Sequence, residues 1–261
     1  MTDIIQIPKV ADPRGNLSFI QSGPAGSCPF VPQVVKWWYD LSSAPGSGLH
    51  PVLRHDAMFV ALSGSFDCDG RTFRNPATAL FADPQGSVAL TDPATNTVVM
   101  MLEGGDDPSE TPAPADVDPH PTSSVDDCRV IDLQRIVIPG VGSCSWVDNS
   151  DSVLPFAVRR VFYLYDVPAD ATRGGHSHFE AQELIVAMAG SFDVVLDDGK
   201  NQPRRFTLNR PYLGLYIPTG IWRTLENFSG GAVSTVLTSH PYSEPDYVRE
   251  YQRFKSLTNP R

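Results

Sequence analysis

Two histidines separated by one residue form the part of this sequence best suited to chemistry. His176 and His178 close the segment Arg173-Gly174-Gly175-His176-Ser177-His178, and the apolar run 184–188 after them predicts a buried strand. Side chains of a strand alternate between its faces, so both imidazoles should point into one cavity. A neutral imidazole titrates near about pH 6.5 and can take a proton from a carbon beside a carbonyl. Paired imidazoles also bind metal ions.

The residues that follow distinguish proton transfer from metal binding. The spacing of His176, His178 and Glu183 resembles the first metal motif of the cupin superfamily. The second motif of that superfamily resembles the segment 218–227, but Arg223 stands where the fourth ligand is expected. A guanidinium stays protonated and cannot donate a lone pair to a metal. We therefore expect no bound metal, although the two histidines and Glu183 could still form a three-ligand face.

Positive charge and a phenol accompany the histidines. Arginines stabilise an enolate and hold a pyrophosphate, and this part of the chain contains Arg159, Arg160, Arg173, Arg204, Arg205 and Arg223. On the expected strand 158–166, alternation groups Arg160 with Phe162 and Arg159 with Tyr163. The pattern leaves open which pair points inward.

The chain contains an internal repeat. A constant shift of 126 positions superimposes His50 on His176 and the segment 64–67, Gly-Ser-Phe-Asp, on the segment 190–193. Under this shift the chemical residues are lost from the first copy: His178 corresponds to Val52, Arg173 to Ser47, Tyr163 to Trp37 and Glu183 to Ala57. We infer two copies of one β fold, of which the first is structural.

The fold class follows from short apolar segments about ten residues apart, which predict an all-β protein of two tandem jelly-roll β-barrels. We expect a degenerate domain over 1–103, an acidic Pro-rich linker over 104–127 and a catalytic domain over 128–261. The tail predicts a short C-terminal helix capped by Ser243, with Tyr247, Val248, Tyr251 and Phe254 as its apolar stripe.

Composition limits the class of partner. The formal net charge is −10, but seven acidic residues and no Lys or Arg lie in 104–127, so the rest is close to neutral. We expect no nucleic-acid partner. No apolar run reaches the roughly 18 residues of a membrane span, and the first residues do not resemble a signal peptide. We therefore expect a cytoplasmic protein without membrane contact, whose four scattered cysteines are buried.

Over 129–254 the sequence resembles the cupin sugar-nucleotide 3,4-ketoisomerases, which act on dTDP-4-keto-6-deoxyglucose. The matching stretches are 160–163, 173–178, 190–191, 197–199, 214–218 with Trp222, 242–244 and 246–251. The resemblance implies an isomerisation through an enediol with no metal or other cofactor. It assigns His178 as the base at C3, His176 as an aid to proton delivery at C4 and Tyr163 as the group that orients the sugar. Its implied substrate-binding residues are Arg160, Arg173, Trp222, Arg223 and Glu183.

The sequence departs from that family in two respects. Glu183 stands where members often carry glutamine, which adds a negative charge and supports metal binding. The family also forms homodimers that exchange an N-terminal strand, whereas this chain carries its own second copy. Segment 12–19 resembles the exchanged strand but lies in the first half. We therefore expect a monomer in which the two halves form an internal pseudo-dimer with one active site.

Three alternatives remain at the level of sequence. A metal-dependent cupin enzyme is favoured by Glu183 and opposed by Arg223. A non-catalytic nucleotide-sugar binding module would use the histidines only as hydrogen-bonding groups. A 3,5-epimerase of the same substrates uses a similar barrel and is disfavoured by the ketoisomerase motifs. The product stereochemistry at C4 is left open.

Overall fold

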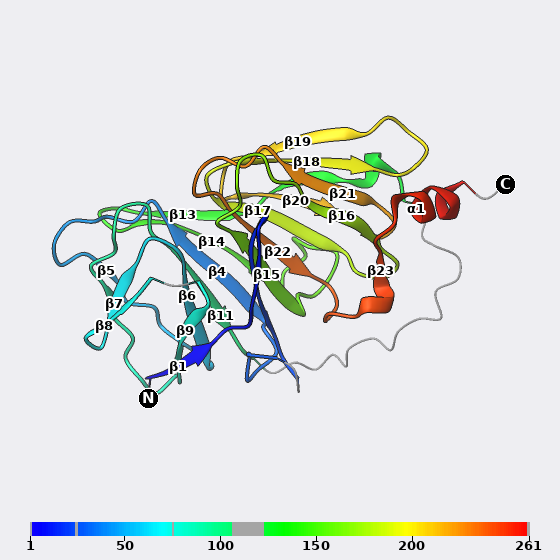
Figure 1. Cartoon of the computed structure of the whole chain (residues 1–261). Helices are drawn as coiled ribbons and strands as arrows, with labels where there is room; N and C mark the ends of the chain where they lie inside the picture. Colours follow the sequence, from blue (N-terminus) through cyan, green and yellow to red (C-terminus); the bar gives the residue numbers. More distant parts are fainter. Residues whose placement is uncertain (1, 24–25, 75, 106–122, 260–261) are drawn as a thin grey trace.

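Strands dominate this protein, as the spacing of its apolar segments predicts (Figure 1). The computed structural model describes residues 2–23, 26–74, 76–105 and 123–259. Within these residues the strands form four sheets, which we name the first and second inner sheets and the first and second outer sheets. The all-β prediction is confirmed. Most of the expected linker, residues 106–122, lies outside the described residues.

The first inner sheet has the order β1 (Thr2–Gln6), β9 (Thr78–Ala82), β6 (Ala57–Ser63), β11 (Val98–Glu103), β4 (Val34–Tyr39), β14 (Gly142–Asp148) and β13 (Gln134–Ile138). The first outer sheet has the order β5 (Gly48–Leu49), β10 (Leu90–Thr91), β7 (Phe66–Cys68) and β8 (Arg71–Phe73). Every pairing within these two sheets is antiparallel.

The second inner sheet has the order β12 (Arg129–Asp132), β20 (Leu213–Ile217), β17 (Glu183–Ala189), β22 (Val233–Thr238), β15 (Arg160–Tyr165), β3 (Gly15–Gln21) and β2 (Lys9–Asp12). The second outer sheet has the order β19 (Arg204–Leu208), β18 (Phe192–Asp197), β21 (Trp222–Glu226), β16 (Arg173–His178) and β23 (Tyr247–Val248).

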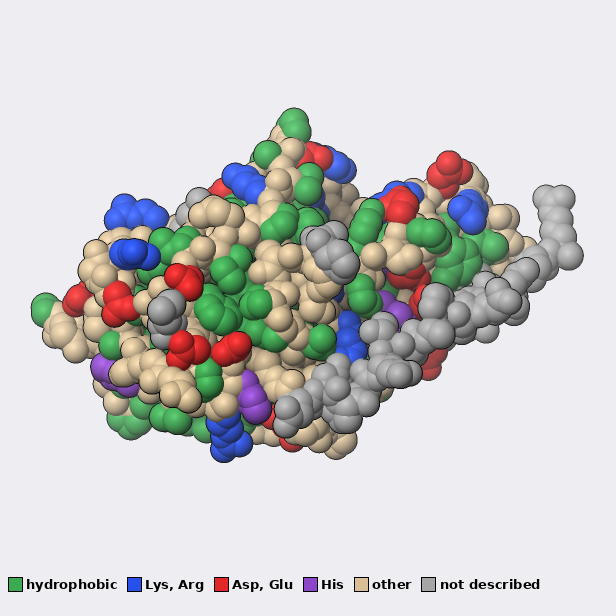
Figure 2. All heavy atoms as spheres, turned by 90° about the horizontal axis from the view of Figure 1, so that it is seen from below, with side chains coloured by type: hydrophobic (Ala, Val, Ile, Leu, Met, Phe, Trp, Pro, Cys, Tyr) green, Lys and Arg blue, Asp and Glu red, His purple; other side chains and the backbone are tan. Residues whose placement is uncertain are grey.

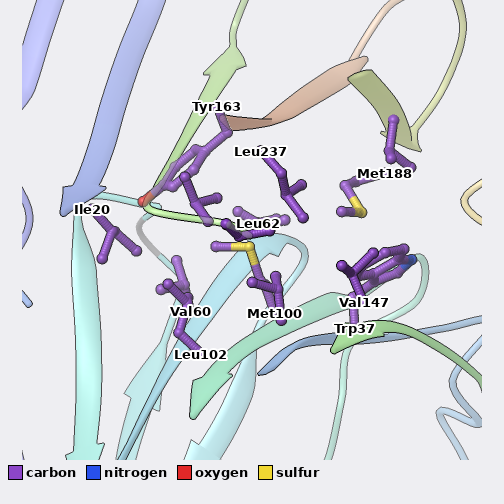
Figure 3. Close-up of a cluster of buried hydrophobic side chains, with 14 of the residues drawn as sticks. Ile20, Trp37, Val60, Leu62, Met100, Leu102, Val147, Tyr163, Met188 and Leu237 are labelled. Carbon is purple, nitrogen blue, oxygen red and sulfur yellow. The ribbon is translucent and has the colours of Figure 1, made fainter. Parts of the chain in front are cut away.

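Strand alternation explains why the sheets stack in four layers. The two inner sheets pack face to face across one large apolar core (Figure 3). Alternate residues of β4 and β15 enter this shared core, namely Val35, Trp37, Tyr39, Val161, Tyr163 and Tyr165. The intervening residues face away from it, so Trp38 packs toward the first outer sheet and Leu164 toward the second.

The two halves of the chain exchange hairpins. β2 and β3, from the first half, complete the second inner sheet, with Asn16 opposite Tyr165. β13 and β14, from the second half, complete the first inner sheet, with Ser143 opposite Tyr39. Each inner sheet therefore contains strands from both halves, and the green ribbons of β13 and β14 beside the blue β4 show this in Figure 1.

The structure supports the internal repeat strand by strand. The order of the first inner sheet matches that of the second when β4 is placed on β15, β6 on β17 and β11 on β22. Equivalent hydroxyl contacts follow both exchanged hairpins: Ser18 Oγ lies 3.2 Å from Tyr165 Oη, and Ser145 Oγ lies 3.0 Å from Tyr39 Oη. Because main-chain pairing and side-chain contacts repeat together, the two halves are copies of one topology.

The interiors of the two copies are filled differently. Between the first inner and outer sheets, apolar side chains pack closely, among them Trp38, Phe59, Phe66 and Met101. Ala57 takes the place that Glu183 holds in the second copy and is fully buried. The first copy thus encloses an apolar core where the second encloses polar groups.

The tail differs in part from its prediction. The expected short helix is present as α1 (Tyr251–Thr258), after two short 3₁₀ turns in this half, η1 (Val125–Asp127) and η2 (Glu244–Asp246). The sequence pattern predicted that Tyr247 and Val248 belong to the helix, and this prediction is wrong. They form β23, which pairs with His178 and Ser177 of β16. Main-chain pairing with the histidine strand prevents a helix from beginning at Ser243.

The surface carries charges of both signs. In the view of Figure 2, acidic and basic side chains are scattered among apolar ones and do not form one continuous basic face. None of the described helices has the length and apolar character required to span a bilayer.

Candidate active site

A cavity of about 560 Å³ lies between the second inner and second outer sheets. Its apolar walls come from Leu17, Phe19, Phe162, Leu164, Ile185, Leu225 and Val236. Its polar groups are Asp12, Arg14, Gln21, Arg160, Arg173, His176, Glu183, Arg223, Tyr242, Tyr247 and Arg249. An apolar cavity with a few convergent polar groups is typical of a small-molecule site.

The structure settles which face of β15 points inward. Arg160 and Phe162 line the cavity, whereas Tyr163 enters the shared core on the opposite face. Tyr163 is fully buried in the shared core (Figure 3). Its hydroxyl donates a hydrogen bond to the carbonyl of Pro76. Burial raises its pKa well above the ordinary value. The prediction that Tyr163 orients a substrate is therefore wrong, because strand alternation directs its side chain away from the cavity.

Trp222 is also misassigned by the sequence. It precedes Arg223 on β21, and the two side chains therefore point to opposite faces. Arg223 lines the cavity, while the Trp222 ring packs 5.1 Å from Tyr251 and 5.5 Å from Phe254 of α1. Trp222 packs the C-terminal helix against the sheet and does not line the cavity.

Two consecutive glycines set the course of β16 before the histidines. Gly174 and Gly175 have φ values of 80° and 70°, which side chains with a Cβ rarely adopt. A Cβ on Gly174 would lie 2.8 Å from the carbonyl oxygen of Arg223. The irregular pairing at this point lets β16 follow β21 closely and brings His176 opposite Arg223.

The two histidine rings lie together, as predicted, but they are not equally exposed. Their centroids are 5.1 Å apart and the rings are nearly perpendicular. His176 lines the cavity, and both of its ring nitrogens lack a hydrogen-bond partner among the described residues. His178 is only 2% exposed and touches the cavity-lining residues Glu183 and Tyr247. Access from the cavity to His178 therefore passes these two side chains.

A buried row of charged groups surrounds His178. Asp246 Oδ2 lies 2.7 Å from its Nδ1, and Glu183 Oε1 lies 3.3 Å from its Nε2. The same oxygen of Glu183 lies 2.6 Å from a terminal nitrogen of Arg223. All four side chains are at least nine-tenths buried. Each imidazole nitrogen thus faces its own carboxylate.

The row of charges determines ionisation in the site. Burial opposes ionisation of Glu183, but the Arg223 guanidinium and the His178 ring outweigh it and hold its pKa below the ordinary value. Burial likewise opposes ionisation of Asp246, yet contact with His178 lowers its pKa. Burial, followed by the Arg223 charge, lowers the pKa of His176 well below the ordinary value. Glu183 and Asp246 are therefore ionised near neutral pH, and His176 is neutral.

The C-terminal segment contributes residues that were not assigned to the site from the sequence. Tyr247 lies over both imidazoles, with ring centroids 4.9 Å from His176 and 4.3 Å from His178. Arg160 donates a 3.2 Å hydrogen bond to the Tyr247 hydroxyl, and the Arg249 guanidinium lies 4.1 Å from the Tyr247 ring centre. Tyr247 is thus the phenol that accompanies the histidines. The position of Tyr247 depends on the pairing of β23 with β16. No local sequence pattern predicts this pairing.

The first half of the chain supplies one wall of the cavity. Asp12 and Arg14 form an ion pair at 2.7 Å there, and Gln21 accepts a 3.2 Å hydrogen bond from the backbone of Tyr242. Arg173, from the second half, donates to the carbonyl of Gly15 at 3.1 Å. Segment 12–19 resembles the family's exchanged strand, but none of its residues was predicted to belong to the site.

The remaining predicted binding residues meet in the cavity. Arg160, Arg173, Arg223 and Glu183 all line it. Arg160 is 4% exposed, and its Nε has no hydrogen-bond partner among the described residues. No described carboxylate pairs with this buried cation, which favours binding of an anionic or oxygen-rich ligand.

A divalent metal is a poor match for this donor set. His176, His178 and Glu183 each offer a ligand atom, and these atoms lie within 4.8 Å of one another. However, the Arg223 guanidinium is bound to Glu183 Oε1, and its positive charge would oppose a cation at the same oxygen. Ligation would require displacement of a buried guanidinium that has no other carboxylate among its described partners.

Comparison with known proteins is consistent with this geometry. The family described as "FdtA: WxcM-like, C-terminal" matches residues 1–90 and 126–259, which include both halves and all of the cavity-lining residues. The chain belongs to this family. The match over 1–90 includes the exchanged hairpin of β2 and β3.

Characterised relatives resemble about half of this chain. A TDP-4-oxo-6-deoxy-alpha-D-glucose-3,4-oxoisomerase from Aneurinibacillus thermoaerophilus is 36% identical over 127 residues, which are 49% of this chain and 89% of that protein. A solved 3,4-ketoisomerase from Helicobacter canadensis is 36% identical, with 51% of this chain and 97% of that chain covered and a TM-score of 0.48. The TDP-quinovose 3,4-ketoisomerase WlaRB from Campylobacter jejuni is 37% identical, with 50% and 98% covered and a TM-score of 0.47.

The Glu183–Arg223 ion pair makes a prediction about pH. Because the pKa of Glu183 lies below its ordinary value of 4.5, the pair contributes stability above about pH 4.5 that is lost as the pH falls through the depressed value. In Arg223→Gln, Glu183 stays buried without its cation, so its pKa rises and ionisation destabilises the fold as the pH increases. Urea unfolding between about pH 4 and 8 should show the two proteins diverging with pH. Parallel profiles would contradict this account of the pair.

Proposed function

We propose that this chain is a sugar-nucleotide 3,4-ketoisomerase that converts TDP-4-keto-6-deoxyglucose to the 3-keto isomer. The observation that carries the proposal is a cavity lined by a neutral imidazole, by several arginines and by a carboxylate that contacts a second, buried imidazole. The reaction class agrees with the named activity of the relative that is 36% identical over 127 residues.

The reaction moves two protons, and the site offers two groups for them. A proton leaves C3 while another reaches C4, and the hydroxyl proton of O3 passes to O4 as the carbonyl changes place. We assign removal of the C3 proton to His178 acting with Glu183, which lines the cavity and contacts Nε2 of His178. Neutral His176 aids delivery of the proton to C4. Arg223 stabilises the negative charge of the enediolate.

The arginines of the cavity suit the rest of the substrate. Arg160 and the Tyr247 hydroxyl that it binds are placed to orient the sugar oxygens. Arg173 and Arg14 lie close enough that the charge of Arg14 lowers the pKa of Arg173, after the larger effect of burial. Asp12 pairs with Arg14 at this wall, so the two guanidiniums exceed the carboxylate by one positive charge. We assign this place to the pyrophosphate because the excess charge favours an anion.

We further propose that the halves 1–103 and 128–261 form an internal pseudo-dimer and that the protein works as a monomer with one active site. The exchanged hairpins and the matching strand orders support this view. The single site follows from the loss of the histidine pair, the arginine and the glutamate from the first copy. The first copy then serves as the wall and support of the second.

A metal-dependent cupin reaction is the second candidate, because three possible ligand atoms lie within 4.8 Å of one another. The Arg223–Glu183 contact disfavours it on grounds of charge. We also propose a cytoplasmic location. All four cysteines lie within the described residues, where they are buried and unpaired, and thiols persist best in a reducing compartment.

The proposed reaction can be followed by proton NMR in deuterated water. Incubation of the chelator-treated protein with TDP-4-keto-6-deoxyglucose should give a 3-keto product with deuterium at C4, because the transferred proton exchanges with solvent. His178→Ala should abolish the product, and Tyr247→Phe should slow it about tenfold or more through loss of one oriented hydroxyl.

Tyr163→Phe is the matched control for this experiment. It removes a hydroxyl of the same kind from the shared core, so turnover should stay within about twofold while stability falls by about 1 kcal/mol. A larger loss of turnover in Tyr163→Phe than in Tyr247→Phe would refute the assignment of the phenol. Turnover that requires added metal would favour the second candidate.

Arg14 tests the contribution of the first half to the site. Arg14→Ala should raise the KM about tenfold with little change in kcat, because the guanidinium contacts a part of the substrate that does not react. Arg71→Ala, on β8 far along the chain from the cavity wall, serves as the control and should change neither constant. An unchanged KM in Arg14→Ala would remove the first half from the binding site.

The exchange of hairpins predicts different oligomeric states for the full chain and for a fragment of its second half. The full chain should have the mass of one molecule, 28.5 kDa, by light scattering. A fragment of residues 123–261 lacks β3 and leaves β15 with an open edge, and its own β14 is then free to pair there in a second copy. The fragment should therefore form a dimer. A dimer of the full chain, or a stable monomeric fragment, would contradict the pseudo-dimer.

A further inference from the structure

Asp246 contacts His178, the proposed base, but has no role in the mechanism proposed above. Asp246 ends the short turn η2, immediately before β23, and does not line the cavity. Its Oδ2 nevertheless lies 2.7 Å from Nδ1 of His178, and both side chains are at least nine-tenths buried. A buried carboxylate that contacts the proposed base, yet cannot touch a substrate in the cavity, acts through that base.

We propose that Asp246 is a positioning residue that keeps a proton on Nδ1 of His178 and so reserves Nε2 for proton transfer. The role of Nε2 rests on the proposed isomerase function, whereas the position of the Nδ1 proton does not. The two ring nitrogens of a histidine are distinct, and the partner of one decides the state of the other. The carboxylate of Asp246 lies 2.7 Å from Nδ1, whereas Glu183 Oε1 lies 3.3 Å from Nε2 and is already paired with Arg223. Because a carboxylate only accepts, the single proton of the neutral ring is held on Nδ1, which faces the nearer carboxylate without another cation.

Backbone contacts fix the carboxylate independently of the histidine. Asp246 Oδ1 accepts a 2.6 Å hydrogen bond from the backbone N–H of Glu180, and its own carbonyl accepts one from Phe179 at 3.0 Å. The next residue, Tyr247, is paired with His178 in the β16–β23 ladder. With Oδ1 committed to the backbone, Oδ2 is the atom left for the imidazole.

The charges of the buried row agree with this proton position. Asp246 and Glu183 supply two negative charges, and Arg223 supplies one positive charge. Because Arg223 pairs with Glu183, the charge left without a cation is that of Asp246, and the N–H dipole of the neutral ring is best directed toward it. The Nδ1 proton occupies the gap to Asp246, which leaves the gap between Nε2 and Glu183 for the proton that moves during the reaction.

Replacement of Asp246 by asparagine reverses this arrangement without a change of shape. The backbone N–H of Glu180 requires an acceptor, so the amide oxygen takes the place of Oδ1 and the NH₂ group takes the place of Oδ2. The NH₂ group then donates to Nδ1 and moves the ring proton to Nε2. His178 keeps its position but loses the free atom with which it removes a proton.

The test combines Asp246→Asn with ¹⁵N NMR of histidine-labelled protein, in which the His178 signals are assigned by their loss in His178→Gln. The wild type should show a protonated Nδ1, and Asp246→Asn should show an unprotonated Nδ1. With TDP-4-keto-6-deoxyglucose, kcat should fall about 10²- to 10⁴-fold while KM stays within about threefold.

Asp198→Asn is the matched control. Asp198 is equally buried and accepts backbone N–H groups of Val125, Lys200 and Asn201, but among the described residues it does not contact a histidine. The Asp198→Asn variant should be less stable than the wild type, whereas its His178 tautomer and its kcat should not change. Equal losses of kcat in both variants would show that Asp246 has only a structural role.

The proton position also separates this inference from the proposed function. A wild-type His178 that carries its proton on Nε2 alone would overturn the role of Asp246, whether or not Asp246→Asn folds. A protonated Nδ1 that is lost in Asp246→Asn, together with no turnover of the substrate in the wild type, would uphold the positioning role and reject the isomerase. A protonated Nδ1 in Asp246→Asn would reject the positioning role alone.

Discussion

The pairing of β3 with β15 is the interaction on which the cavity depends. β15 carries Arg160 and Phe162 into the cavity and Tyr163 into the shared core, and β3 holds it in place from its open edge. The same hairpin brings Arg14 to the mouth of the cavity. Main-chain hydrogen bonds along a whole strand thus fix the wall, the register and the charged rim together.

The two copies show how one topology accommodates opposite interiors. The strand orders match, yet the first copy packs Trp38, Phe59 and Met101 where the second has an open space with charged walls. Burial of large apolar groups stabilises a fold, whereas burial of Glu183 and Arg223 requires each to neutralise the other. The first copy therefore has an apolar interior suited to structural support, and the second has a charged cavity suited to ligand binding.

The sequence predicts those features that depend on local spacing. The histidine pair follows from the period of a strand, and the repeat follows from a constant shift over both halves. Tyr163 and Trp222 are misplaced because alternation defines two faces without saying which one is inside. Asp246 and Tyr247 are missed because their places depend on β23 pairing with a strand about 70 residues earlier, and only the fold brings these segments together.

The hairpin exchange has a consequence for how the site responds to dilution. A wall donated by a separate molecule is lost as the concentration falls below the dissociation constant of the pair. A wall tethered within the same polypeptide is held at an effective concentration that dilution does not alter. The tether also frees the two copies from identity, since a substitution in one is not imposed on the other. The apolar interior of the first copy is the kind of divergence that such independence permits.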